Sequence, residues 1–103
     1  LKMNKHIFQS YIDNITQFFG ISQSELFSGA RDYDSLEQRQ LFFYLCNKRG
    51  IPVASIQRFL EKNNYNIHHS NILRGIQKMN ERIEQSEDYK QIIPRLEVIT
   101  ADV

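Results

Sequence analysis

The sequence has little that would interrupt a helix. Among its 103 residues there are only two prolines and four glycines, so most of the chain can be helical. There is no long alternation of apolar and polar residues, which argues against β-strands. No uncharged apolar run reaches the roughly 18 residues of a membrane span, so we expect no membrane partner. The single cysteine, Cys46, cannot form an internal disulfide, which fits a cytoplasmic protein.

The groupings of residues that enzymes use are also missing. No glycine-rich loop followed by lysine is present to cradle phosphates, so we expect no ATP hydrolysis. His68 and His69 are adjacent, and on a helix their side chains point about 100° apart, which is poor geometry for a metal site. No Ser/His/Asp or Cys/His set stands out. We therefore expect no enzymatic activity, no cofactor, no metal and no small-molecule substrate.

The spacing of apolar residues predicts an all-α fold of about six helices in a single small domain, residues 1–103. The hydrophobic fraction of 41% is sufficient for one core. A first helix is expected over about 4–19, where Gly20 follows the last apolar residue as a C-terminal cap would. Ser22 and Glu25 have the spacing of a capping box, which opens a short second helix.

The third helix is expected to be the central and most buried one. It follows a loop over 29–34, is capped by Asp34 or Ser35, and runs to about Lys48. Because it is apolar on nearly every side, we expect its aromatic residues and Cys46 to lie in the core.

The last three helices include a pair of interest. Pro52 suits the first turn of a fourth helix, and a polar segment over 62–66 separates this helix from a fifth. The fourth and fifth helices, about residues 52–85, have the layout of a helix-turn-helix. Ser86 then precedes a last helix, which Pro94 is expected to kink or to restart as a separate turn.

The net charge of +1 conceals an uneven distribution. From Arg39 to Arg82 the chain has eight basic and two acidic residues, a net charge of +6, and the remainder has a net charge of −5. A basic middle between acidic flanks suggests a polyanionic partner for the middle. Solvated lysines are common on any surface, so the charge alone does not identify that partner.

The stretch NIHHSNILRGIQKM, residues 66–79, combines apolar residues at helical spacing with a polar start. In one interpretation, Asn66 or His68 caps the helix and the other polar residues are solvated. In the other, the polar start reads DNA bases, because a recognition helix contacts base edges near its N-terminus. Short serine and asparagine side chains can approach base edges closely. Arg74 and Lys78, further along, would then meet phosphates or a guanine.

Several motifs match those of a known family in order and spacing over about residues 11–93. The segment His68-His69-Ser70-Asn71-Ile72-Leu73 stands in the place of an Asp-His-Thr-Thr-Val-Leu signature, and Lys78-Met79 stands in the place of a later lysine-plus-apolar pair. Arg39-Gln40 matches an Arg-Gln pair that opens the long central helix. In these motifs the sequence resembles the C-terminal DNA-binding domain of DnaA, the bacterial replication initiator, which has a Trp-repressor-like helix-turn-helix.

The resemblance implies roles for the matching positions on double-stranded DNA. His69 and Ser70 fall where the family reads bases in the major groove, and Asn71 falls on a second threonine near the backbone. Arg31 falls on an arginine that the family inserts into the minor groove. Expected base contacts are therefore His69, Ser70, Asn71 and Arg31. Expected backbone contacts are Arg39, Gln40, Lys62, His68, Arg74 and Lys78.

Departures from the family pattern predict a different target sequence. Asp32 and Asp34 follow closely after Arg31, and their charge should weaken its contact with DNA phosphates in the minor groove. His68 replaces the family's aspartate, which removes an acceptor for a cytosine amine.

Two functions are open at this point. One is sequence-specific binding of double-stranded DNA at the nucleoid, in replication initiation or its regulation. The other is a protein-interaction module on the same fold, turned toward a replication or transcription protein. The salt dependence of binding discriminates between them, because phosphate contacts give a steep fall of affinity with salt.

Overall fold

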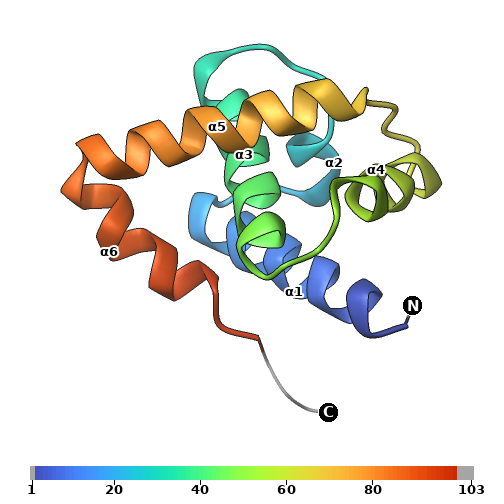
Figure 1. The fold of residues 1–103 in the computed structure, drawn as a ribbon, viewed down its shortest axis with the longest axis horizontal. Helices are drawn as coiled ribbons and strands as arrows, with labels where there is room; N and C mark the ends of the chain where they lie inside the picture. The colour runs from blue at the N-terminus through green and yellow to red at the C-terminus, as the bar shows by residue number, and fades with distance from the viewer. Residues whose placement is uncertain (1, 100–103) are drawn as a thin grey trace.

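The computed structural model describes the backbone of residues 2–99 and the side chains of residues 5–99. Six helices follow one another: α1 (Lys2–Phe19), α2 (Gln23–Leu26), α3 (Tyr33–Lys48), α4 (Val53–Lys62), α5 (His69–Gln85) and α6 (Glu87–Leu96) (Figure 1). The described part has no strand, so the all-α prediction is confirmed. Residue 1 and residues 100–103, which the predicted domain includes, lie outside the described residues.

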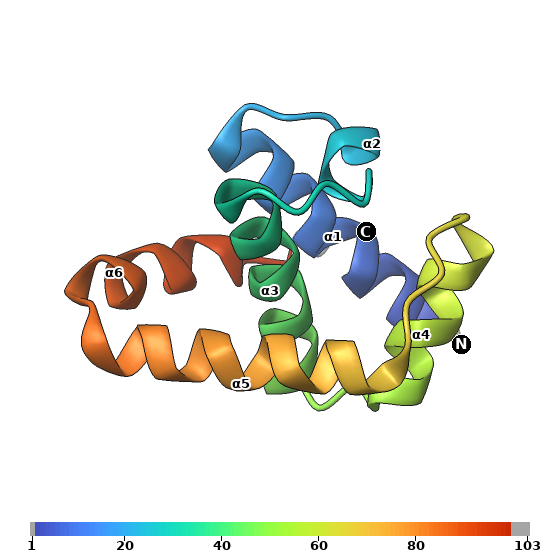
Figure 2. The same ribbon diagram turned by 90° about the horizontal axis from the view of Figure 1, so that it is seen from above.

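Helix α3 runs through the middle of the molecule, with α1 and α5 on different sides of it (Figures 1 and 2). It packs against α1, α2, α4 and α5. Phe42 of α3 is fully buried, and the ring centroids of Phe8, Phe27 and Phe59 lie 6.2, 5.4 and 6.4 Å from its own. Each such aromatic pair adds about 0.5–1.5 kcal/mol beyond area burial. The same core includes residues of all six helices, and Cys46 lies in it as predicted.

The connection from α1 to α3 follows the expected signals. Gly20 has a φ of +68°, the left-handed conformation of a C-terminal cap. The Glu25 amide donates to the Ser22 hydroxyl at 3.1 Å, and the Ser22 amide donates to the Glu25 carboxylate at 2.8 Å. The predicted capping box at α2 is therefore confirmed.

The cap of α3 differs from the prediction of Asp34 or Ser35. Asp32 caps this helix: its carboxylate accepts from the Ser35 amide at 3.1 Å and from the Ser35 hydroxyl at 2.8 Å. These two bonds from Ser35 hold the pKa of Asp32 below its usual value. The prediction was wrong because Ser35 serves as the donor three residues after the cap, which lets the helix begin at Tyr33.

Helix α6 contains Pro94 in its last turn and continues to Leu96, so no separate turn forms there. A proline near a helix end removes only one backbone donor. Contacts from α1 and from α3 hold the end of α6 in place. The Asn14 amide of α1 donates to the carbonyls of Leu96 and Val98 at 2.8 and 2.7 Å, and Lys48 pairs with Glu97 at 2.7 Å.

Candidate functional site

Helices α4 and α5 pack against each other and are joined by a turn over 63–68. Hydrogen bonds fix the backbone conformation of this turn. Asn64 adopts the left-handed conformation, with a φ of 65°, and the Tyr65 amide donates to the Leu60 carbonyl at 2.9 Å. The Gln57 side chain of α4 donates to the Ile67 carbonyl at 2.9 Å. These bonds hold the start of α5 relative to α4.

His68 is the N-cap of α5. Its Nδ1 accepts from the Ser70 amide at 3.2 Å and lies 2.8 Å from the Ser70 hydroxyl. The His68 and His69 rings are stacked, with centroids 4.6 Å apart. Capping by His68 therefore accounts for part of the polar start of residues 66–79. It does not account for His69 and Asn71, which are exposed.

The depth at which α5 sits on α3 is set by Gly75. This residue is buried, and a Cβ placed on it would stand 3.0 Å from Cδ2 of Phe43 and 3.3 Å from Cγ of Gln40. Real Cβ atoms rarely come so close, so a glycine permits this approach. Sequence reasoning missed the position, although a glycine inside a helical pattern is a recognised signal of close packing.

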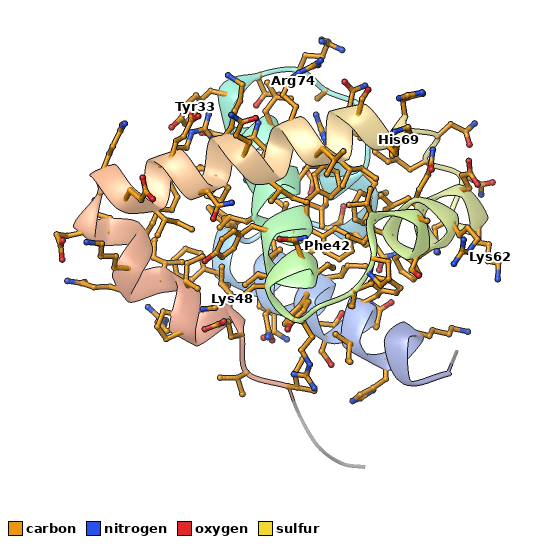
Figure 3. The ribbon with its side chains drawn as sticks, viewed as in Figure 1. Tyr33, Phe42, Lys48, Lys62, His69 and Arg74 are labelled. Carbon is orange, nitrogen blue, oxygen red and sulfur yellow. The ribbon has the colours of Figure 1, made fainter. Side chains whose placement is uncertain are left out.

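A hollow of about 490 Å³ lies beside α5, and we call it the α5 hollow. Its walls come from α5, from residues 36–43 of α3, from the loop at residues 29–31 and from the turn before α5. Seven of the ten predicted site residues line it: Arg31, Arg39, Gln40, His68, Asn71, Arg74 and Lys78. Arg74 lies at the edge of α5 that faces the loop (Figure 3).

Arg39 is buried, with 4% of its surface exposed. Its guanidinium donates to the carbonyl of Leu26 at 3.4 Å and to that of Ala30, and it lies 5.9 Å from the centroid of the Tyr65 ring. Arg39 thus joins the loop before α3 to the turn before α5. Arg39 lines the hollow, and its guanidinium donates to the loop that carries Arg31.

Gln40 is also held within the protein. Its side-chain oxygen accepts from Arg82 Nη1 at 2.6 Å, and the Arg82 guanidinium lies 5.1 Å from the centroid of the Tyr33 ring. Sequence reasoning did not single out Arg82. It stands eight residues after Arg74 and four after Lys78, so the three basic residues share one side of α5.

Three predicted residues do not line the α5 hollow: Lys62, His69 and Ser70. Lys62 ends α4 on the side of the molecule away from Arg74, and His69 lies between the two (Figure 3). Ser70 is half-buried and engaged with His68. The structure therefore places Lys62 apart from the group that gathers in the hollow.

The two acids near Arg31 differ in their surroundings. The Asp32 carboxylate is turned into the start of α3, where Ser35 occupies both of its oxygens. Asp34 is exposed in the first turn of α3, and Arg31 itself is exposed. Both carboxylates are exposed, and the lowered pKa of Asp32 keeps it charged, so both oppose a phosphate near Arg31.

Asn71 and Arg74 form a pair on the side of α5 that borders the hollow. Arg74 Nη1 donates to Asn71 Oδ1 at 2.9 Å, and both side chains are exposed. Neither ion pair found in the described part of the chain includes Arg74. Its charge is therefore not compensated by a carboxylate in those pairs.

Comparison with known proteins adds no relative from which a function could be inferred. Within residues 2–99, no group of three or more His, Cys, Asp or Glu side chains is placed to hold a metal ion, and no helix has the length and apolarity needed to cross a membrane. No protein-family model matches the sequence, and no curated protein or solved structure matches it. The resemblance to the DnaA family is therefore a prediction from the sequence motifs alone.

Proposed function

We propose that this domain binds double-stranded DNA in a sequence-specific manner, with α4 and α5 as a helix-turn-helix and α5 in the major groove. The observation that carries the proposal is the α5 hollow, which is lined by Arg31 from the loop and by Lys78 from α5. A hollow lined by cations on two sides suits one DNA strand's phosphates. If that strand occupies the hollow, α5 enters the major groove on one side of the strand, and Arg31 reaches the minor groove on the other side.

The N-terminal turn of α5 supplies the residues proposed to read bases, as in other recognition helices. His69 and Asn71 are exposed there, and Ser70 lies between them. Lys62 and His68 are proposed to meet the backbone at the same end of α5. Arg39 and Gln40 are proposed to act indirectly rather than by touching DNA. Arg39 holds the loop through Ala30, and Gln40 holds Arg82. A part in replication initiation or its regulation, at the nucleoid, rests on the likeness to DnaA.

A second function is favoured by two exposed side chains. Leu73 is 49% exposed on α5, where a DNA-binding surface would need few apolar residues. Asp34 is exposed beside Arg31, where it would repel phosphate. The alternative is therefore a protein-interaction surface on α5 for a replication or transcription protein, without base readout.

The salt dependence of binding tests the proposal against this alternative. Fluorescence anisotropy on a labelled duplex pool should show log affinity falling steeply with log salt, by about 0.9 for each phosphate neutralised. Lys78→Ala should weaken binding to all sequences and reduce that slope by about one phosphate. Lys90→Ala is the matched control, because Lys90 lies on α6 and pairs with Glu87 at 3.1 Å. Equal slopes for the two variants would contradict the proposal.

A further inference from the structure

The contact between Asn71 and Arg74 changes what Asn71 can recognise. A free asparagine offers one acceptor oxygen and two donor hydrogens, and it reads adenine by using both kinds of group, on the N6 amine and on N7. Here Asn71 Oδ1 accepts from Arg74 Nη1 at 2.9 Å. That oxygen keeps a second lone pair, but an adenine amine that approached it would lie beside the cationic guanidinium, which repels the partly positive amine hydrogens. Adenine readout by Asn71 is therefore disfavoured while the pair is intact.

The outward face of the pair consists of donors. Asn71 keeps its Nδ2 hydrogens, and Arg74 keeps the guanidinium hydrogens that it does not give to Asn71. In the major groove, only guanine presents two adjacent acceptors, O6 and N7. Cytosine presents an amine donor, and thymine presents a single acceptor beside a methyl group. The complementary base edge for two neighbouring donor groups is therefore that of guanine.

We propose that Asn71 and Arg74 act as one unit that reads a guanine in the major groove, an inference that rests on the proposed function. Arg74 supplies the donors to O6 and N7, and Asn71 orients the guanidinium. Asn71 is thus a positioning residue with a donor of its own toward the same base pair or its neighbour.

The unit stands on a rigid support. The Asn71 amide donates to the His68 carbonyl at 2.9 Å in the first turn of α5, and Gly75, the residue after Arg74, is fixed against Phe43. The two side chains are three residues apart on one helix, a spacing at which they meet without strain. Holding the guanidinium in place before binding reduces the conformational entropy lost on binding.

The test uses duplexes selected from a random pool by the unmodified domain and by three variants, Arg74→Lys, Asn71→Ala and Gln77→Ala. The unmodified domain should enrich a motif with a guanine that Arg74→Lys selects less strongly, since lysine can still donate to guanine but lacks the planar fork. Asn71→Ala should weaken the same preference. Gln77→Ala is the control, because Gln77 is exposed on α5 and does not line the hollow. It should keep the motif.

A second readout removes one acceptor from the DNA. Replacing the selected guanine with 7-deazaguanine, which removes one of the two acceptors, should lower the affinity of the unmodified domain by roughly 2- to 12-fold, and that of Arg74→Lys by less. Selection of adenine at the position, or an unchanged guanine preference in Arg74→Lys, would overturn this inference and leave DNA binding intact. No binding to any duplex at low salt would overturn the proposed function and the inference together.

Discussion

Gly75 of α5 lies against the Phe43 ring of α3, so closely that a Cβ on Gly75 would stand 3.0 Å from the ring carbon Cδ2. A glycine inside a helix costs roughly 1 kcal/mol relative to alanine, and the close approach of the two helices explains why it is tolerated here. The contact lies beneath the α5 hollow, whose wall includes both residues. The position of the proposed recognition helix therefore depends on it.

Replacing Gly75 with a branched residue should push α5 away from α3. Gly75→Val is expected to lower the free energy of unfolding by about 1–3 kcal/mol, the usual cost of overpacking a core, as measured by urea denaturation. Gln77→Val is the matched control, since it places the same side chain on the exposed side of α5. Equal stabilities for the two variants would show that the contact with Phe43 does not limit the approach.

Removing Arg39 should destabilise the loop that carries Arg31. Arg39→Ala leaves the carbonyls of Leu26 and Ala30 without their donor, and we expect a loss of about 1–3 kcal/mol in the free energy of unfolding. The control is Arg58→Ala, an exposed arginine whose bond goes to a neighbouring serine hydroxyl on the same helix. Chemical denaturation of both variants gives the comparison, and a loss no larger than the control's would contradict the structural role of Arg39.

The stability of the domain should fall at alkaline pH. Burial, together with hydrogen bonds to Glu37 and Tyr33, raises the pKa of Tyr89 above its usual value of 10.0. The folded state therefore keeps this proton more firmly than the unfolded chain does. The resulting stabilisation is complete below about pH 10, the unfolded pKa of tyrosine, and is lost as the pH rises toward the folded pKa.

Tyr89→Phe tests this pH dependence. The variant should be about 1 kcal/mol less stable at pH 7, because it lacks the hydroxyl that donates to Glu37. Its free energy of unfolding should fall less steeply above pH 10 than that of the unmodified protein. Some fall should remain, because burial also raises the pKa of Tyr11 and of Cys46. Parallel pH profiles for the two proteins would contradict the assignment to Tyr89.

Cys46 should be unreactive while the protein is folded. Its side chain has no exposed surface, and burial raises the pKa of the thiol well above its usual value, so the reactive thiolate is scarce. A thiol reagent such as 5,5′-dithiobis(2-nitrobenzoic acid) should modify it at a rate that rises with urea in step with unfolding. Rapid modification in native buffer would be inconsistent with a core position.

The helices could be predicted from the sequence because their signals are local. Apolar spacing, the Ser22–Glu25 capping box and the glycine after α1 all act within a few residues, and the structure confirms them. The cap of α3 was misassigned to Asp34 or Ser35, since Asp32 lies only two residues before Asp34 and takes the role with Ser35 as its donor. Which residue caps the helix depends on the conformation of the preceding loop.

The site was predictable in its residue types but not in its internal contacts. The basic and polar residues of α5 were identified from their spacing. The bonds from Arg39 to Ala30 and from Arg82 to Gln40 were not, because their partners lie 9 and 42 residues away in the chain. The first forms where the preceding loop folds back onto α3, and the second where α5 packs on α3. Consequently Arg39 was expected on the DNA backbone, whereas the structure places it beneath the loop, with 4% of its surface exposed.

Selection from a pool of random duplexes, with the bound fractions sequenced over several rounds, tests the central claim most directly. The account predicts that one short motif is enriched at moderate salt, and that Ser70→Ala or Asn71→Ala changes this motif while thermal unfolding shows both variants to be folded. Binding that enriches no motif would contradict base reading by α5. Failure to bind any duplex even at low salt would contradict DNA binding itself.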